Sequence, residues 1–195
     1  MNLRALRPEA GTPRALVRAL CLAAVLSYSA CFAQGTANLA EYQIKAAYLY
    51  KFLGFIEWPP SAFQPPDAPL TIGVLGAGSL ADELTQIVAN RQAGGRPVLV
   101  RRVQPGQPTT DLHVLFVARA ETHRLAAMAA ATKDKPLLVV TETDEAATQQ
   151  GSAINFVVVD DKVRFDVALQ AVERASLKVS ARLLTVARKV YPGAS

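Results

Sequence analysis

The chain has 195 residues, of which 51% are hydrophobic and 19% charged, with 11 glycines and 12 prolines. This composition fits one ordinary globular domain and excludes a disordered or collagen-like chain. The formal charge is +5, but residues 1–33 hold four arginines against one glutamate, which leaves only +2 for the rest. The folded part is therefore nearly balanced in charge, and we expect no nucleic-acid partner.

Residues 1–33 have the pattern of a secretory signal. A basic leader runs from Arg4 to Arg18, and an apolar run follows over residues 19–30. Small residues stand at Cys31 and Ala33, the −3 and −1 positions of a cut after Ala33. The apolar run is shorter than the roughly 20 residues of a membrane span. The pattern predicts export to the periplasm, with a mature domain over residues 34–195.

Two alternatives to plain cleavage stay open. The leader could remain as an N-terminal anchor, or Cys31 could be lipidated, since Ser29-Ala30-Cys31 resembles the end of a lipidation box. Cleavage after Ala33 would remove both cysteines of the chain, Cys21 and Cys31. The mature protein would then have no thiol and no disulfide.

The first predicted element of the mature chain is a buried helix. Asn38 and Glu41 have the spacing of a capping box. Apolar side chains then recur every three or four residues, at Ile44, Tyr48, Phe52 and Phe55. Trp58-Pro59-Pro60 ends the helix, and the five prolines of residues 59–69 indicate an extended surface connection.

Short apolar runs then alternate with helical patterns. We expect strands over 70–75, 97–103, 112–117 and 136–141, a hairpin of 154–159 with 163–167, and helices over 79–90, 121–132, 167–177 and 181–190. Ser79 is the expected cap of the second helix. The strands are apolar throughout, as in a sheet covered on both faces. The sequence therefore predicts a three-layer α/β domain whose mostly parallel sheet has about five to six strands and a C-terminal hairpin, flanked by helices.

One glycine motif is compatible with a nucleotide site. Gly76-Ala77-Gly78-Ser79-Leu80-Ala81 matches G-x-G-x-x-A between a strand and a helix, where backbone amides can approach a pyrophosphate. Arg101 and Arg102 stand where a dinucleotide fold usually has an acid, which would suit the 2′-phosphate of NADP. A glycine-rich corner is also the default way to join a strand to a helix, and no second domain is left for a substrate.

Other chemistry-bearing residues have simple structural explanations. His113 is expected as a hydrogen-bonded histidine at a strand end and His123 as an exposed one, so no metal site and no bound cofactor are predicted. Asp160 and Asp161 fit a tight turn, although together with Asp166 they could also act as acid and base. No serine stands in a G-x-S-x-G motif, so we expect no catalytic residues.

Aromatic and basic groups remain as contact candidates. Tyr48 and Trp58 could be core residues, or could stack on a ligand or anchor an interface. Arg182, Arg188 and Lys189 are predicted on the last helix, as a solvated face or as a contact for a partner or for anionic headgroups. The candidate ligand or partner contacts are Tyr48, Trp58, Gly76, Gly78, Ser79, Arg182 and Arg188.

The order of segments resembles the YfiR-like periplasmic proteins (DUF4154). The resemblance rests on these blocks: Lys45-Ala46-Ala47-Tyr48-Leu49-Tyr50-Lys51-Phe52, Phe55-Ile56-Glu57-Trp58-Pro59, Ile72-Gly73-Val74-Leu75-Gly76, His113-Val114-Leu115-Phe116-Val117, Ile154-Asn155-Phe156, Lys162-Val163-Arg164-Phe165 and Ser180-Ala181-Arg182-Leu183-Leu184. They cover nearly all of residues 41–191.

The resemblance implies a non-enzymatic periplasmic regulator that is often dimeric. The best-known member of the family binds the periplasmic sensor part of an inner-membrane diguanylate cyclase and holds it inactive, and an outer-membrane lipoprotein can sequester it. That member relies on cysteines in its folded domain, whereas residues 34–195 contain none, so redox control does not carry over. The alternatives are a periplasmic small-ligand-binding module with its site near Gly76 to Ser79, and an NADP-binding enzyme.

Overall fold

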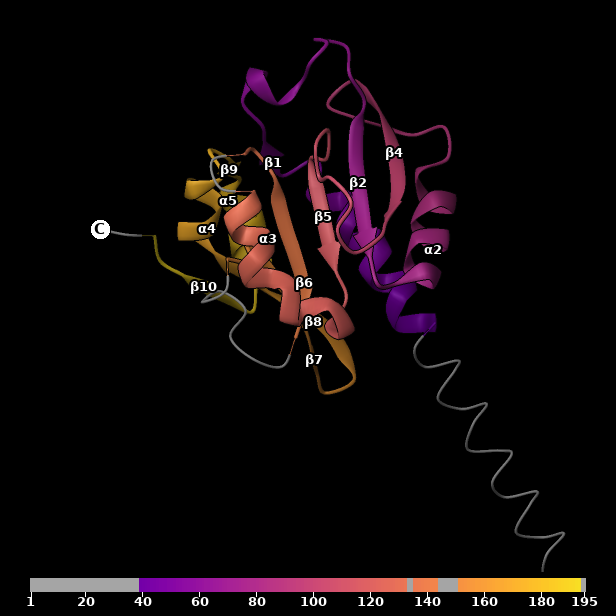
Figure 1. Cartoon of the computed structure of the whole chain (residues 1–195). Coiled ribbons are helices and arrows are strands. Elements are labelled where there is room, and N and C mark those ends of the chain that lie inside the picture. The colour runs from indigo at the N-terminus through magenta and orange to yellow at the C-terminus, as the bar shows by residue number, and fades with distance from the viewer. Residues whose placement is uncertain (1–38, 133–134, 144–150, 194–195) are drawn as a thin grey trace, which may run out of the picture. The chain divides into compact units, whose positions relative to one another are not determined.

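An eight-stranded sheet forms the centre of the molecule (Figure 1). The computed structural model describes residues 39–132, 135–143 and 151–193. The predicted signal over residues 1–33 and the Asn38 cap therefore lie outside the described residues. The strands are β2 Leu70–Leu75, β3 Gln92–Ala93, β4 Arg96–Val103, β5 Val114–Val117, β6 Leu138–Glu142, β7 Ile154–Val159, β8 Lys162–Ala168 and β10 Lys189–Tyr191.

The strand order is β10-β8-β7-β6-β5-β2-β4-β3. The five consecutive strands from β7 to β4 are parallel, and β7 and β8 form the predicted antiparallel hairpin. The α/β class and the mostly parallel sheet are confirmed, but there are more strands than the expected five to six. The additional strands β3 and β10 are short edge strands of two and three residues, which carry too little pattern to be recognised.

The helices are, in chain order, a helix over residues 39–52, α2 Gly78–Val88, α3 Leu125–Ala131, α4 Leu169–Arg174 and α5 Ala181–Val186, with 3-10 turns η1 Pro60–Ala62 and η2 Arg119–Arg124. Two short strands, β1 Ile56–Glu57 and β9 Lys178–Val179, pair with each other beside the main sheet. This pairing, which the sequence did not predict, joins the end of the first helix to the start of α5.

The last predicted helix is too long. We expected it over residues 181–190, but α5 ends at Val186 and the chain turns into strand β10. The amide of Arg188 donates to the carbonyl of Phe165, and β10 then pairs in parallel with β8. Arg188 and Lys189 are therefore not helical: their backbone lies along the edge strand β8, and the Arg188 side chain forms an ion pair with Asp166 of that strand.

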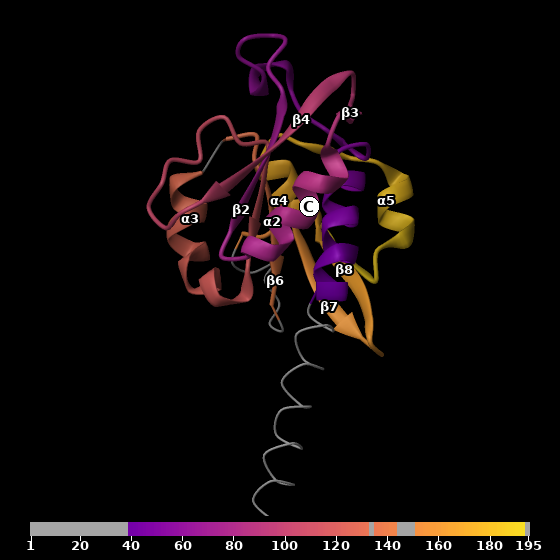
Figure 2. The ribbon, with the colours of Figure 1, turned by 90° about the vertical axis from the view of Figure 1, so that its right-hand side faces the viewer.

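The two faces of the sheet are covered unequally (Figure 2). The first face, which carries Ile72, Phe116 and Phe156, packs against the helix over 39–52, α2, α4 and α5 in one large core. The second face, which carries Leu75, Leu115 and Val117, has a smaller core under η2 and α3. Figure 2 shows α3 on one side of the sheet and the helix over 39–52 and α5 on the other.

The connection from β4 to β5 explains this inequality. It must pass β2 to reach its place in the sheet, because β2 lies between β4 and β5. A parallel crossover of this kind usually contains a helix, but residues 104–113 form only turns and extended chain. The second face is thus covered by an irregular loop where a helix would be expected.

Candidate functional site

A buried charge cluster lies at the carboxyl end of β6. Lys45 on the helix over 39–52 is 2% exposed, and its Nζ forms ion pairs with Glu142 at the end of β6 and with Glu41 one helical turn before it. The Tyr42 hydroxyl donates to Glu142 Oε1 over 3.4 Å, and the Arg119 amide donates to the same oxygen over 3.2 Å. We call Glu41, Tyr42, Lys45 and Glu142 the edge cluster.

Tyr42 stays protonated within the edge cluster. Burial, and next the negative charge of Glu142, raise the pKa of Tyr42 to about 12, so the phenol stays neutral and donates a hydrogen bond to the carboxylate. Every buried side-chain nitrogen or oxygen in the described part of the chain has a hydrogen-bond partner. The edge cluster therefore joins the first helix to the carboxyl end of β6.

Sequence reasoning did not single out the edge cluster. The available signal was Lys45 itself, which shares the inward side of its helix with Leu49 and Phe52. A lysine at such a position needs a buried partner. That the partner is Glu142, 97 positions away, could not be read from local pattern.

Tyr48 lies over the aromatic core of the first face. Its ring is 5.6 Å from that of Phe165 and 6.1 Å from that of Phe156, measured between centroids, and it stacks on Phe52. The ring is half-buried and belongs to the packing of helix 39–52 on the β7–β8 hairpin. An additional contact with a partner stays a prediction.

Trp58 lies apart from Tyr48, beside His113. Its Nε1 donates to the His113 carbonyl over 3.2 Å, and the two rings meet edge to face. Trp58 thus joins the proline-rich connection to the start of β5.

His113 is hydrogen-bonded in the way the sequence predicts. Its Nδ1 accepts from the Thr71 amide and its Nε2 donates to the Ala62 carbonyl, each over 3.1 Å. The ring is stacked on Phe63 at 4.7 Å. Burial, the largest effect, lowers the pKa of His113, so the imidazole is neutral at pH 7. His123 is exposed, also as predicted.

The glycine turn is present, but side chains occupy the space beside it where a phosphate group would bind. Gly76 has φ +80°, and a Cβ there would lie 2.7 Å from Glu121 Cγ and 3.1 Å from Ala118 Cβ. A carboxylate-bearing side chain thus packs over the turn, which disfavours a pyrophosphate. Arg101 binds the carbonyls of Pro108 and Thr110 and is therefore held by the 104–113 loop; Arg102 pairs with Asp82 of α2.

The expected Ser79 cap is wrong. α2 begins at Gly78 with Ala77 as its N-cap, and Ser79 is an exposed residue of the first turn. The left-handed backbone of Gly76 brings the chain into the helix two residues earlier than the serine pattern suggests. Gly78 is exposed, with open space where a Cβ would be.

The predicted basic residues have different environments. Arg182 is exposed on α5. Arg188 forms a two-pronged ion pair with Asp166 of β8, whose side chain is only 5% exposed. The hydrogen bonds to Asp166 are the main reason that the pKa of Arg188 is raised. Asp166 is therefore a structural partner, and Asp160 and Asp161, with φ of 50° and 56°, make the hairpin turn.

Seven large apolar side chains are exposed in the described part of the chain. Leu99 lies on β4, and the other six are Leu39, Ile44, Val158, Val159, Val186 and Val190. These six belong to the first helix, the β7–β8 hairpin, α5 and β10. We call them the apolar surface.

The YfiR/HmsC-like family model (DUF4154) matches residues 42–188. The chain belongs to the YfiR/HmsC-like family. The match includes Tyr42, Lys45 and Glu142 of the edge cluster and extends through α5 to Arg188. No curated protein sequence matches the chain significantly.

YfiR/HmsC-like proteins are regulators and not enzymes. In the part of this chain that the structure describes, no helix has both the length and the apolar character needed to cross a bilayer. Over the same residues, no three His, Cys, Asp or Glu side chains gather as metal ligands would.

Proposed function

We propose that this chain is an exported periplasmic regulator that binds the periplasmic sensor part of an inner-membrane diguanylate cyclase and represses it. The family match over residues 42–188 carries this proposal. The basic and apolar leader over residues 1–33 supports delivery to the periplasm.

Repression then follows from differential binding. If the regulator binds the inactive state of the sensor more tightly than the active one, it shifts the sensor toward inactivity. An outer-membrane lipoprotein that competes for the regulator would reverse the shift, and a homodimer would present two contact surfaces. The diguanylate cyclase and the lipoprotein are both implied by the family resemblance.

The apolar surface is the proposed contact. Ile44 and Val158 are each 46% exposed and Val186 is 66% exposed, so their burial by a partner would be favourable. Arg182 lies four residues before Val186 on α5 and adds a cation beside it. Large exposed apolar groups with a polar border are typical of protein interfaces.

The test measures capture of membrane proteins by the tagged mature regulator, and cyclic di-GMP in cells. We expect a membrane diguanylate cyclase among the captured proteins, and higher cyclic di-GMP when the gene is deleted. Ile44→Asp and Val186→Asp should each weaken capture at least tenfold. Leu99→Asp, an equally exposed leucine on the distant strand β4, is the matched control and should not.

Two results would count against the proposal. The first is capture without any membrane sensor, together with unchanged cyclic di-GMP on deletion. The second concerns only the surface: if Leu99→Asp weakens capture as much as Ile44→Asp, the contact is not where we place it.

A further inference from the structure

The helix-free crossover between β4 and β5 leaves a cavity on the second face of the sheet. The cavity has a volume of about 560 Å³ and lies between residues 104–110 and helix α3. This volume is within the range of about 300–1,000 Å³ that small-molecule sites occupy. A helix in the crossover would have filled the space with side chains, so the cavity is a direct consequence of the loop.

The floor of the cavity is apolar. It includes Leu75 and Val103, the last residues of β2 and β4, and one wall includes Ala127 and Met128 of α3. The cavity thus opens beside the carboxyl ends of two parallel strands, which is where open α/β sheets bind ligands.

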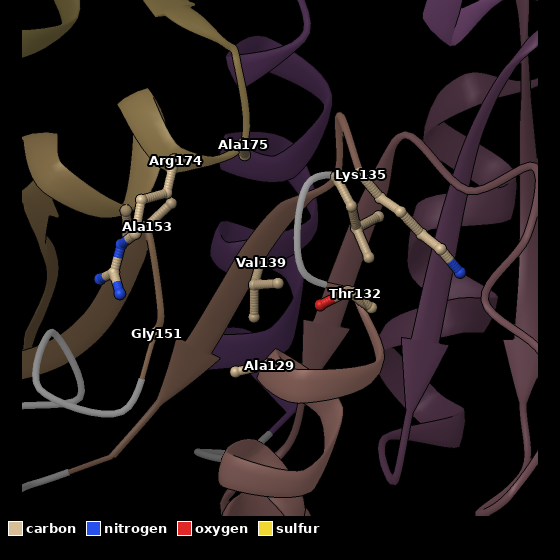
Figure 3. Close-up of a pocket in the computed structure, with 10 residues that line it drawn as sticks. Ala129, Thr132, Lys135, Val139, Gly151, Ala153, Arg174 and Ala175 are labelled. Atoms are coloured by element: carbon tan, nitrogen blue, oxygen red, sulfur yellow. The ribbon is translucent and has the colours of Figure 1, made fainter.

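Among the residues that the structure describes, the ionisable residues of the lining are all bases. They are His123, Arg124 and Lys135, and no described aspartate or glutamate lines the cavity. Arg124 also pairs with Glu121 over 2.7 Å, which leaves Lys135 as the main attraction for an anion. Figure 3 shows a neighbouring pocket between α3, β6 and α4, which shares Thr132 and Lys135 with the cavity. In this view the Lys135 amine points away from Val139 and Ala129, whereas Arg174 lies on the opposite side of Val139.

From these observations we infer that the cavity between α3 and residues 104–110 binds a small amphipathic anion. The apolar body of the ligand contacts Leu75, Val103 and Met128, and its carboxylate or sulfonate lies toward Lys135 and Arg124. Polar loop residues such as Gln107 and Thr109 form the remaining rim. This site is separate from the proposed apolar surface, and it does not depend on which protein the regulator binds.

The helix α3 offers a matched pair of variants. Ala127 lines the cavity and Ala130 does not, although both are exposed on the same helix. Ala127→Trp therefore fills the cavity, and Ala130→Trp adds the same ring to the outside. Ala131→Trp is a second filling variant, since Ala131 is also exposed and lines the cavity.

The experiment titrates the mature protein with 8-anilinonaphthalene-1-sulfonate and follows its fluorescence at pH 7.5, with circular dichroism to verify the fold of each variant. We expect saturable binding at one site per chain, and displacement by octanoate at a concentration at least tenfold below that needed for octanol. Ala127→Trp and Ala131→Trp should weaken dye binding at least tenfold, and Ala130→Trp less than twofold. Lys135→Gln should weaken octanoate binding several-fold but leave octanol unchanged; Lys51→Gln, an exposed lysine on the first helix, is its control.

Different outcomes test the location of the site and the anionic character of its ligand. Absence of saturable binding to the folded wild type, or equal binding by the Ala127→Trp and Ala130→Trp proteins, overturns the site. Equal displacement by octanoate and octanol overturns the anionic character of the ligand. Neither result bears on capture of a membrane sensor, so a failure here and a failure of the proposed function are distinguishable.

Discussion

At the scale of single residues, the strongest constraints are charges taken out of water. Lys45 is almost completely buried, and its charge is neutralised by Glu142 and Glu41. Tyr42 and the Arg119 amide donate further hydrogen bonds to the Glu142 carboxylate. Burying these charges costs solvation free energy. Removing one partner destabilises the folded state further, because the other partner stays charged and desolvated.

Removal of one member of the edge cluster should therefore destabilise the protein strongly. We expect Glu142→Leu to lower the free energy of unfolding by about 3–5 kcal/mol, because the buried Lys45 ammonium loses its main partner. Lys51→Met, on the exposed side of the same helix, should change it by less than about 0.5 kcal/mol. Urea unfolding followed by circular dichroism measures both, and similar losses in the two variants would contradict the role of the cluster.

His113 should make the stability depend on pH. Its pKa is lowered in the folded protein from the usual 6.5, so above about pH 6.5 the neutral imidazole contributes its full stability. As the pH falls below 6.5, the unfolded chain takes up a proton that the folded chain resists, and this stability is progressively lost. A proton on Nδ1 would also face the Thr71 amide that now donates to it.

The check is urea unfolding between pH 7.5 and 5.0. We expect His113→Gln to have a flatter pH profile than the wild type. His123→Gln should retain the wild-type profile, because His123 is exposed. If His123→Gln flattens the profile instead, the assignment to His113 is wrong.

At the scale of elements, the C-terminal edge of the sheet depends on one ion pair. β10 has three residues and pairs only with β8 in the described chain. Arg188, just before it, covers the buried carboxylate of Asp166. The pair thus holds a strand that is too short to be stable by its backbone hydrogen bonds alone.

Arg188→Ala should loosen this edge. The variant leaves a buried carboxylate without its partner, and we expect a loss of about 1–3 kcal/mol in unfolding free energy together with faster hydrogen exchange in residues 189–191. Arg182→Ala removes an exposed arginine from the neighbouring helix α5 and should lower the free energy of unfolding by less than about 0.5 kcal/mol. Unchanged exchange in the Arg188→Ala protein would show that β10 is held by other contacts.

At the scale of the whole molecule, stability rests on two unequal cores without covalent cross-links. Four helices contribute side chains to the core of the first face, whereas the second face is covered by η2, α3 and a loop. Residues 34–195 contain no cysteine, so no disulfide can compensate for the weaker face.

Reductant should therefore have no effect on the mature protein. We expect the same thermal midpoint with and without dithiothreitol, within about 1 °C, when the full chain is expressed with its own leader and the processed protein is purified from the periplasm, because a stabilising disulfide would typically contribute about 2–4 kcal/mol. Differential scanning calorimetry provides the measurement. A clear decrease with reductant would mean that Cys31 or Cys21 is retained and cross-linked.

The sequence by itself determined the local pattern of this protein. The strand over 70–75, the hairpin around Asp160 and Asp161, the helix that carries Tyr48 and the hydrogen-bonded environment of His113 all follow from residues close in the chain, and so does the lack of cysteine after Ala33. Apolar periodicity and turn chemistry act over a few residues, which is why they can be read directly.

Only the tertiary structure decided which distant groups meet. It paired Lys45 with Glu142 and Arg188 with Asp166, turned the end of the predicted last helix into strand β10, and placed Glu121 over the glycine turn that resembles a nucleotide motif. It also left the cavity beneath the 104–113 loop. These features depend on strand order and on the path of one crossover. The local pattern of a short segment does not specify which distant residues will lie beside it in the folded chain.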